Sequence, residues 1–137
     1  FAMKLLMDPT RFDVVVTTNM FGDILSDEAA GLVGGLGMAP GLCVGPDYCM
    51  AQATHGSAPD IAGRNIANPF AMIESARMML SWLANKKGDA AGVRAADELA
   101  QAMTAVLADK EAVTPDLGGS GTTTGMGQAI CHKLAQL

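Results

Sequence analysis

The stretch "FDVVVTTNMFGDILSDEAAGLVGGLG", residues 12–37, decides the predicted fold because its two halves carry different periodicities. Phe12 to Thr18 is rich in β-branched and apolar residues, which is typical of a buried strand of the parallel type. From Ile24 to Val33 the apolar residues recur every three or four positions, which indicates an amphipathic helix. Strand, turn and helix in this order are typical of open α/β folds, in which ligands bind near the carboxyl ends of strands.

The rest of the chain predicts few strands and many helices. The Asp8-Pro9 pair ends a helix that covers Phe1 to Met7, because proline disfavours helical geometry in the residue before it. A short strand and a long loop of small residues follow in Asp47–Pro69. Three further helices are expected: one opens at Asn68-Pro69, one runs from Ala90 to Leu107, and the last is capped from within Thr122–Thr124. This α/β pattern has too few strands to complete a sheet, so partner strands are expected from elsewhere.

Composition restricts the class of protein. The chain has 137 residues, of which 50% are hydrophobic and 17% charged, and this suits a single core. Its net charge is -5 and its basic residues are scattered, so nucleic acid is not expected as a partner. The charge-free run Ala29–Pro46 is interrupted by glycines and prolines, so no membrane association is expected from it.

The cysteines indicate the cellular location of the protein, and the first residue indicates whether the chain is part of a larger enzyme. Cys43, Cys49 and Cys131 are odd in number and lack paired spacing, which favours a reducing, cytoplasmic location and buried, unpaired thiols. The chain begins at Phe1, inside a predicted helix and without a signal-peptide layout. We therefore expect it to be a portion of a larger enzyme.

Two acidic residues on the predicted helix form a candidate metal site. Asp23 and Asp27 are four residues apart, which places their side chains on one helical face. Two close carboxylates repel each other unless a cation lies between them, and oxygen ligands suit Mg²⁺ or Mn²⁺. The alternative is that Asp23 caps the helix and Asp27 is a solvated surface charge.

The segment "HGSAPDIAG" forms a candidate nucleotide site. Gly56, Ser57 and Ala58 allow backbone N–H groups to approach a ligand, and Asp60 could accept hydrogen bonds from ribose hydroxyls. The alternative is an ordinary turn in which His55 bonds to the backbone. Asn68 could contact a base, cap the following helix, or do both.

Taken together, "FDVVVTTNMFGDILSDEAAGLVGGLG" and "HGSAPDIAGRNIANP" resemble the isocitrate and isopropylmalate dehydrogenase family of metal-dependent β-decarboxylating dehydrogenases. The resemblance covers essentially the whole chain as the family's carboxyl-terminal part. It implies an α/β two-domain fold with a sheet flanked by helices. Residues 1–34 would belong to the smaller, dimer-forming domain that carries the metal site, and residues 35–137 to the larger cofactor-binding domain.

The resemblance also implies roles for individual residues. Asp23 and Asp27 would be ligands of Mg²⁺ or Mn²⁺. The Asp60-Ile61 pair matches the NAD-using branch, whereas Gln52 stands where relatives often have glutamate, which leaves cofactor preference open at that position. No catalytic residue is assigned, because the expected lysine and tyrosine belong to upstream sequence. The residues implied to bind NAD are Gln52, His55, Gly56, Ser57, Ala58, Asp60, Ile61 and Asn68.

The activity implied is oxidative decarboxylation of a substituted (2R)-malate, of the 3-isopropylmalate or isocitrate type, with hydride transfer to NAD. The substrate would be a hydroxy-diacid or hydroxy-triacid, and the enzyme a homodimer with a shared active site. The isolated chain is not expected to catalyse. The alternatives are a tartrate or homoisocitrate dehydrogenase, a noncatalytic nucleotide-binding regulatory subunit of the same fold, and a structural fragment whose apolar helix mediates association.

Overall fold

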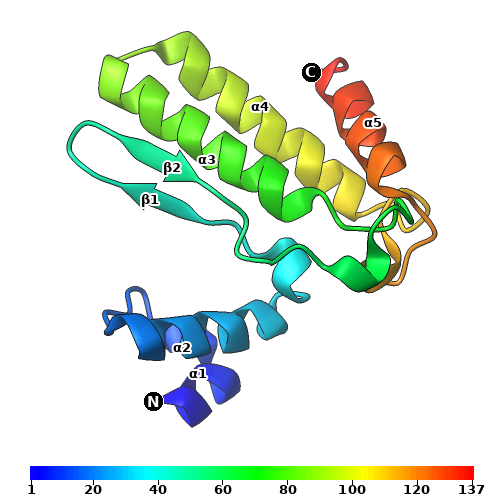
Figure 1. The fold of residues 1–137 in the computed structure, drawn as a ribbon. Coiled ribbons are helices and arrows are strands. Elements are labelled where there is room, and N and C mark those ends of the chain that lie inside the picture. Colours follow the sequence, from blue (N-terminus) through cyan, green and yellow to red (C-terminus); the bar gives the residue numbers. More distant parts are fainter.

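The computed structural model describes residues 1–137 as a helical layer with a small hairpin beside it and an N-terminal arm (Figure 1). In the helical layer α3 packs on α4, and α4 packs on α5. The hairpin lies along α3, and the arm contains α1 and α2. The elements are α1 (Ala2–Met7), α2 (Asn19–Leu32), β1 (Leu42–Val44), β2 (Cys49–Ala51), α3 (Phe70–Lys87), α4 (Ala90–Leu107) and α5 (Thr123–Leu134).

The three C-terminal helices confirm the sequence pattern. Helix α3 ends at Gly88, whose φ of 65° is in the left-handed region that glycine adopts without strain. Asp89 then caps α4, because its side chain accepts hydrogen bonds from the N–H groups of Ala91 and Gly92. The main core lies between α4, α5 and the loop that joins them; its buried residues are Ala102, Met103, Val106, Val113, Met126 and Ile130.

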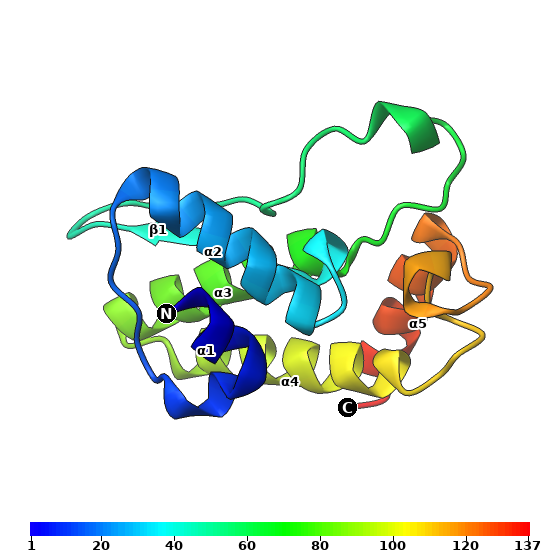
Figure 2. The ribbon, with the colours of Figure 1, turned by 90° about the horizontal axis from the view of Figure 1, so that it is seen from below.

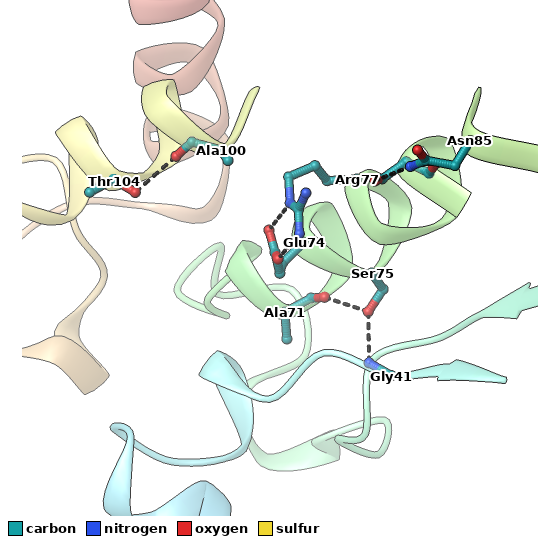
Figure 3. A network of polar contacts seen from close by, with 9 residues as sticks. Gly41, Ala71, Glu74, Ser75, Arg77, Asn85, Ala100 and Thr104 are labelled. Atoms are coloured by element: carbon teal, nitrogen blue, oxygen red, sulfur yellow. Dashed lines mark hydrogen bonds and ion pairs between the residues drawn. The ribbon is translucent and has the colours of Figure 1, made fainter. Parts of the chain in front are cut away.

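A buried hydroxyl joins the hairpin to the helical layer. The Oγ atom of Ser75 donates to the carbonyl oxygen of Ala71 at 2.6 Å and accepts from the N–H of Gly41 at 3.1 Å (Figure 3). Ser75 is fully buried, so the two bonds satisfy a hydroxyl that water cannot reach. This contact holds the chain that enters β1 against the middle of α3.

One strand prediction was wrong, one strand was missed, and the short strand expected after Asp47 is present as β2. Phe12–Thr18 contains no strand: it runs unpaired, and Val14 and Val16 are 81% and 92% exposed. A strand needs a hydrogen-bonded neighbour, and no strand of this chain pairs with it. Strand β1 was missed because its three residues sit in a glycine-rich run; it pairs antiparallel with β2, Cys43 opposite Met50.

The helix after this segment begins earlier than predicted. Thr18 precedes the first turn of α2, which starts at Asn19 rather than near Ile24. The expectation of buried thiols was also wrong, since Cys43 and Cys131 are exposed and Cys49 is half-buried. Their positions on the hairpin and at the solvent side of α5 explain the exposure.

The long connection from β2 to α3 swings out as an arch and returns beside the start of α5 (Figure 2). A single turn of 3-10 helix, Pro59–Ile61, interrupts it. None of the helices has the length and apolar character needed to cross a membrane.

Candidate functional site

The arch encloses a hollow that we call the loop cavity. Its volume is about 760 Å³, which is ample for part of a dinucleotide. Three segments far apart in the sequence form its wall: the chain just after α2, the arch itself, and the approach to α5. The lining residues are Leu36, Gly37, residues 55–58, residues 61–63, residues 65–68, Asp116 and Thr123.

Most of the predicted cofactor residues lie around this cavity. His55, Gly56, Ser57, Ala58, Ile61 and Asn68 all line it. Gln52 and Asp60 do not. Gln52 is exposed and its backbone N–H bonds to the carbonyl oxygen of Gly41 at 3.0 Å, which extends the hairpin. Asp60 is exposed in the 3-10 turn, with its carboxylate outside the lining.

Local backbone geometry shapes the arch side of the cavity. Ala58 has a φ of 44°, in the left-handed region, and it turns the chain into Pro59. The Nδ1 atom of His55 lies 2.9 Å from the carbonyl oxygen of Gly56. Because a carbonyl only accepts, Nδ1 carries the hydrogen in this contact.

Hydrogen bonds between Asn65 and the first turn of α5 hold the arch against α5 at the cavity. The Nδ2 atom of Asn65 donates to Thr124 Oγ1 at 2.9 Å, and its Oδ1 accepts from the N–H of Thr124 at 3.2 Å. The hydroxyl of Thr123 donates to the carbonyl oxygen of Ala67 at 2.5 Å. Thr122 caps α5 as predicted, by accepting from the N–H of Gly125. The role of this segment as a cavity wall was missed, because residues this distant show no signal in the local pattern.

Asn68 bonds to the start of α3, as one of the two roles considered for it requires. Its Oδ1 accepts from the N–H of Phe70, the first residue of α3, at 2.9 Å. Its Nδ2 donates to Asp116 Oδ2 at 2.9 Å and lies 3.5 Å from the sulfur of Met38. The amide is therefore held in one orientation at the cavity wall.

The charge of the lining is informative about ligands. Asp116 is its only carboxylate, and no lysine or arginine lines the cavity. A dianionic phosphate inside the cavity would find no cationic side chain from this chain to neutralise it. The cavity suits a neutral base or sugar.

The two predicted metal ligands lie on α2, away from this cavity. Asp23 and Asp27 are both exposed, and they occupy the second and third turns of a helix that has no acidic residue in its first turn. The capping alternative for Asp23 is therefore wrong, since Thr18 is at the N-cap position. The only side chain bonded to either carboxylate is Asn19, whose Nδ2 lies 3.5 Å from Asp23 Oδ2.

The donor set on α2 suits part of a metal site. The chain brings together no group of three or more His, Cys, Asp or Glu side chains that could hold an ion. Mg²⁺, however, is often bound by one or two carboxylates, with waters and substrate oxygens completing its six ligands. Two exposed carboxylates one helical turn apart, without an ion-pair partner in the chain, fit that pattern.

Comparisons with known proteins identify the family of this chain. Residues 1–130 match the isocitrate/isopropylmalate dehydrogenase family. An isocitrate/homoisocitrate dehydrogenase of Thermus thermophilus is 51% identical over 99% of this chain and 38% of its own length. A homoisocitrate dehydrogenase of Methanocaldococcus jannaschii is 49% identical over 97% of this chain and 36% of its own length.

A solved structure extends the likeness to three dimensions. The isocitrate dehydrogenase of Methylococcus capsulatus superposes with a TM-score of 0.84 at 45% identity, over 97% of this chain and 38% of that one. The chain thus spans about two fifths of the length of the curated relatives it matches. The chain belongs to the isocitrate/isopropylmalate dehydrogenase family and has the carboxyl-terminal part of that family's α/β fold.

Proposed function

We propose that the full-length protein is an NAD-dependent, metal-dependent β-decarboxylating dehydrogenase of a substituted (2R)-malate, of the 3-isopropylmalate or isocitrate type. One observation carries the proposal. In this chain of the family, six of the residues that the sequence analysis named for NAD line one cavity. They are His55, Gly56, Ser57, Ala58, Ile61 and Asn68.

The loop cavity would hold the adenosine end of the cofactor. The backbone of Gly56 to Ala58 and the ring of His55 form one wall, and Asn68 with Asp116 forms another. The absence of lysine and arginine from the lining supports NAD over NADP, because the extra phosphate of NADP would lack a partner. Asp60 would act only at the rim of the cavity, on a ribose that extends beyond the lining.

Asp23 and Asp27 would hold Mg²⁺ or Mn²⁺ together with oxygen ligands from outside this chain. When bound, such an ion supplies Lewis-acid polarisation of a substrate hydroxyl or carbonyl oxygen. The contribution of this chain is to present both carboxylates on the rigid face of α2, one helical turn apart and free of competing ion pairs.

The division into domains follows the proposed function. Residues 1–34 would belong to the smaller, dimer-forming domain and residues 35–137 to the cofactor domain. Gly34 and Gly35, with φ of 114° and 98°, link α2 to the cavity wall at Leu36 in a conformation that only glycine adopts readily. A homodimer would complete the active site with residues from the second subunit.

The test is turnover by the full-length protein. We expect NAD⁺ reduction with isopropylmalate, isocitrate, homoisocitrate or tartrate in the presence of Mn²⁺, loss of activity on chelation, and much weaker activity with NADP⁺. Nucleotide binding without turnover of any of these acids would contradict the proposal and would indicate a regulatory subunit.

A further inference from the structure

The ladder between β1 and β2 changes its hydrogen bonding just before it reaches the loop cavity. The register that pairs Leu42 with Ala51 continues to Gly41 and Gln52. At such a position of a regular antiparallel ladder, the two residues exchange both of their N–H···O bonds. Here only one bond is made, from the N–H of Gln52 to the carbonyl oxygen of Gly41 at 3.0 Å.

A side chain of α3 replaces the missing return bond. The N–H of Gly41 donates to Ser75 Oγ at 3.1 Å, and the same hydroxyl donates to the carbonyl oxygen of Ala71 at 2.6 Å (Figure 3). Ser75 is fully buried, so water cannot take the place of its hydroxyl. Helix α3, rather than the partner strand, therefore fixes the position of the N–H of Gly41.

The one-sided pattern continues toward the cavity. Both the N–H and the hydroxyl of Thr54 donate to the carbonyl oxygen of Ala39, at 3.3 and 2.9 Å, whereas the N–H of Ala39 donates to Leu36. Beyond this point the two segments separate and form different parts of the cavity wall. Leu36 and Gly37 lie on one segment, and residues 55–58 lie on the other.

The two segments touch backbone to backbone at the level of Ser75. A Cβ atom at Gly41 would lie 2.5 Å from the carbonyl oxygen of Gln52, so no side chain fits between them. A displacement of Gly41 is therefore passed directly to Gln52, because no flexible side chain lies between them to absorb it.

Helix α3 holds the hairpin at a second place, far from the cavity. The Nζ atom of Lys86 contacts the carbonyl oxygen of Pro46 and lies 3.4 Å from Asp47 Oδ1, at the tip of the hairpin. The tip and the arch lie at opposite ends of the hairpin in both views (Figures 1 and 2). Ser75 is thus the attachment near the cavity, and Lys86 is the attachment remote from it.

We propose that Ser75 is a positioning residue of the cofactor site, whose hydroxyl fixes the separation of segments 36–41 and 52–58 where they form the cavity wall. This inference rests on the proposed function. The hydroxyl acts through Gly41 and need not touch the ligand. Without it, the N–H of Gly41 loses its partner, and an unpaired donor in a partly buried place is costly. This N–H regains a bond by turning toward the carbonyl oxygen of Gln52, which moves both segments.

The experiment measures NAD⁺ binding by titration calorimetry on the full-length protein. Ser75→Ala removes the hydroxyl and adds no bulk. We expect its dissociation constant for NAD⁺ to rise about tenfold, because the cavity wall loses its set position. Ser75→Cys keeps a weak donor and a weak acceptor at the same place, so its dissociation constant should lie between those of Ser75→Ala and the wild type.

Two controls separate positioning from stability. Lys86→Met releases the remote attachment of the same hairpin and keeps the length of the side chain, and Lys86 does not line the cavity. Ile130→Val leaves a small void in the main core, which lowers the melting temperature, and Ile130 does not line the cavity either. Both variants should bind NAD⁺ as the wild type does.

The outcomes distinguish this inference from the proposed function. Wild-type affinity in Ser75→Ala, or an equal loss of affinity in Ile130→Val, would overturn the positioning role and leave the proposed function standing. If the wild type does not bind NAD⁺, the proposed function fails and the inference fails with it. Should Ser75→Ala not fold, Ser75→Cys decides: weaker binding than the wild type supports the inference, and equal binding overturns it.

Discussion

Residues 1–33 and residues 36–134 were predicted from the same kind of pattern, but they differ sharply in what covers their apolar side chains. In the first region only Ala30 is buried, and Ile24 is 61% exposed on α2. In the second region, Met126 and Ile130 of α5 are enclosed by α4 and the loop before α5. Periodicity therefore predicts that a helix forms and which of its faces is apolar. It does not predict whether another segment of the same chain packs against that face.

The candidate sites of the two regions differ in the same way: one is formed within this chain, and the other lacks further ligands from it. The loop cavity is built wholly within this chain, from Leu36 to Thr123, and its polar groups are positioned by hydrogen bonds among themselves. Asp23 and Asp27 stand on an open helix, with no further ligand of this chain nearby. Four predictions break or sharpen this comparison.

The largest effect is expected from removing both acids on α2. Asp23→Asn combined with Asp27→Asn should lower turnover of the full-length protein by at least about a thousandfold, roughly 4 kcal/mol, because the ion loses its protein ligands. The dissociation constant for NAD⁺ should stay unchanged, since the loop cavity is separate. Glu28→Gln on the same helix is the control. Undiminished turnover with the same metal requirement would refute the metal assignment.

The next effect compares the two apolar environments directly. Met126 is fully buried, and Met126→Ala should reduce the free energy of unfolding of the 137-residue chain by about 2–5 kcal/mol. Ile24→Ala should change it by less than about 0.5 kcal/mol, because this side chain is exposed in the chain. Urea denaturation measures both. Equal decreases in the free energy of unfolding would contradict this contrast, because they would mean that Ile24 is as well packed as Met126.

A smaller effect is expected at the cavity wall. Gly37→Ala should weaken NAD⁺ binding about tenfold, because the added methyl group presses on Asn68 and Asp116. Gly127→Ala on α5 is a matched control, since an added methyl there meets nothing within 4 Å. This control should raise stability by up to about 1 kcal/mol through helix propensity and leave binding alone. Unchanged binding in Gly37→Ala would argue against a ligand at this end of the cavity.

The smallest effect concerns an ion pair on α3. Arg77 donates to Glu74 through Nε and Nη2, each at 2.7 Å (Figure 3). This hydrogen bond raises the pKa of Arg77; burial opposes the shift, and the charges of Glu74 and Asp97 add to it. Glu74→Gln should cost less than about 1 kcal/mol of unfolding free energy, and less still at high salt.

The pH dependence of that ion pair follows from the sign of the shift. The folded-state pKa of Arg77 lies above its unfolded value, so this stabilisation is fully present below the unfolded pKa. It is lost only as the pH rises through the raised pKa, far above neutrality. Urea melts of wild type and Glu74→Gln should therefore differ by the same amount at pH 6 and pH 8, two test conditions on the same plateau. A difference that changes between them would implicate another titrating group.

Local signals account for what could be predicted of the fold and the site. The pattern of α4 matched its observed bounds, Ala90–Leu107, because Asp89 supplies a strong cap and the apolar face repeats regularly. The small residues after His55 were singled out because a close approach of backbone to a ligand requires them. In contrast, Phe12–Thr18 has the composition of a strand but no strand of this chain to pair with, and composition cannot supply one.

By itself, the sequence determined where the three C-terminal helices lie and which of their faces are apolar, and it singled out candidate residues for a nucleotide and a metal ion, since these patterns depend on neighbours within a few residues. The tertiary structure alone decided that Gly37, Asn68 and Asp116 meet, and that Gln52 and Asp60 lie outside the cavity. Such meetings depend on how the chain packs over long separations, and no local periodicity encodes them.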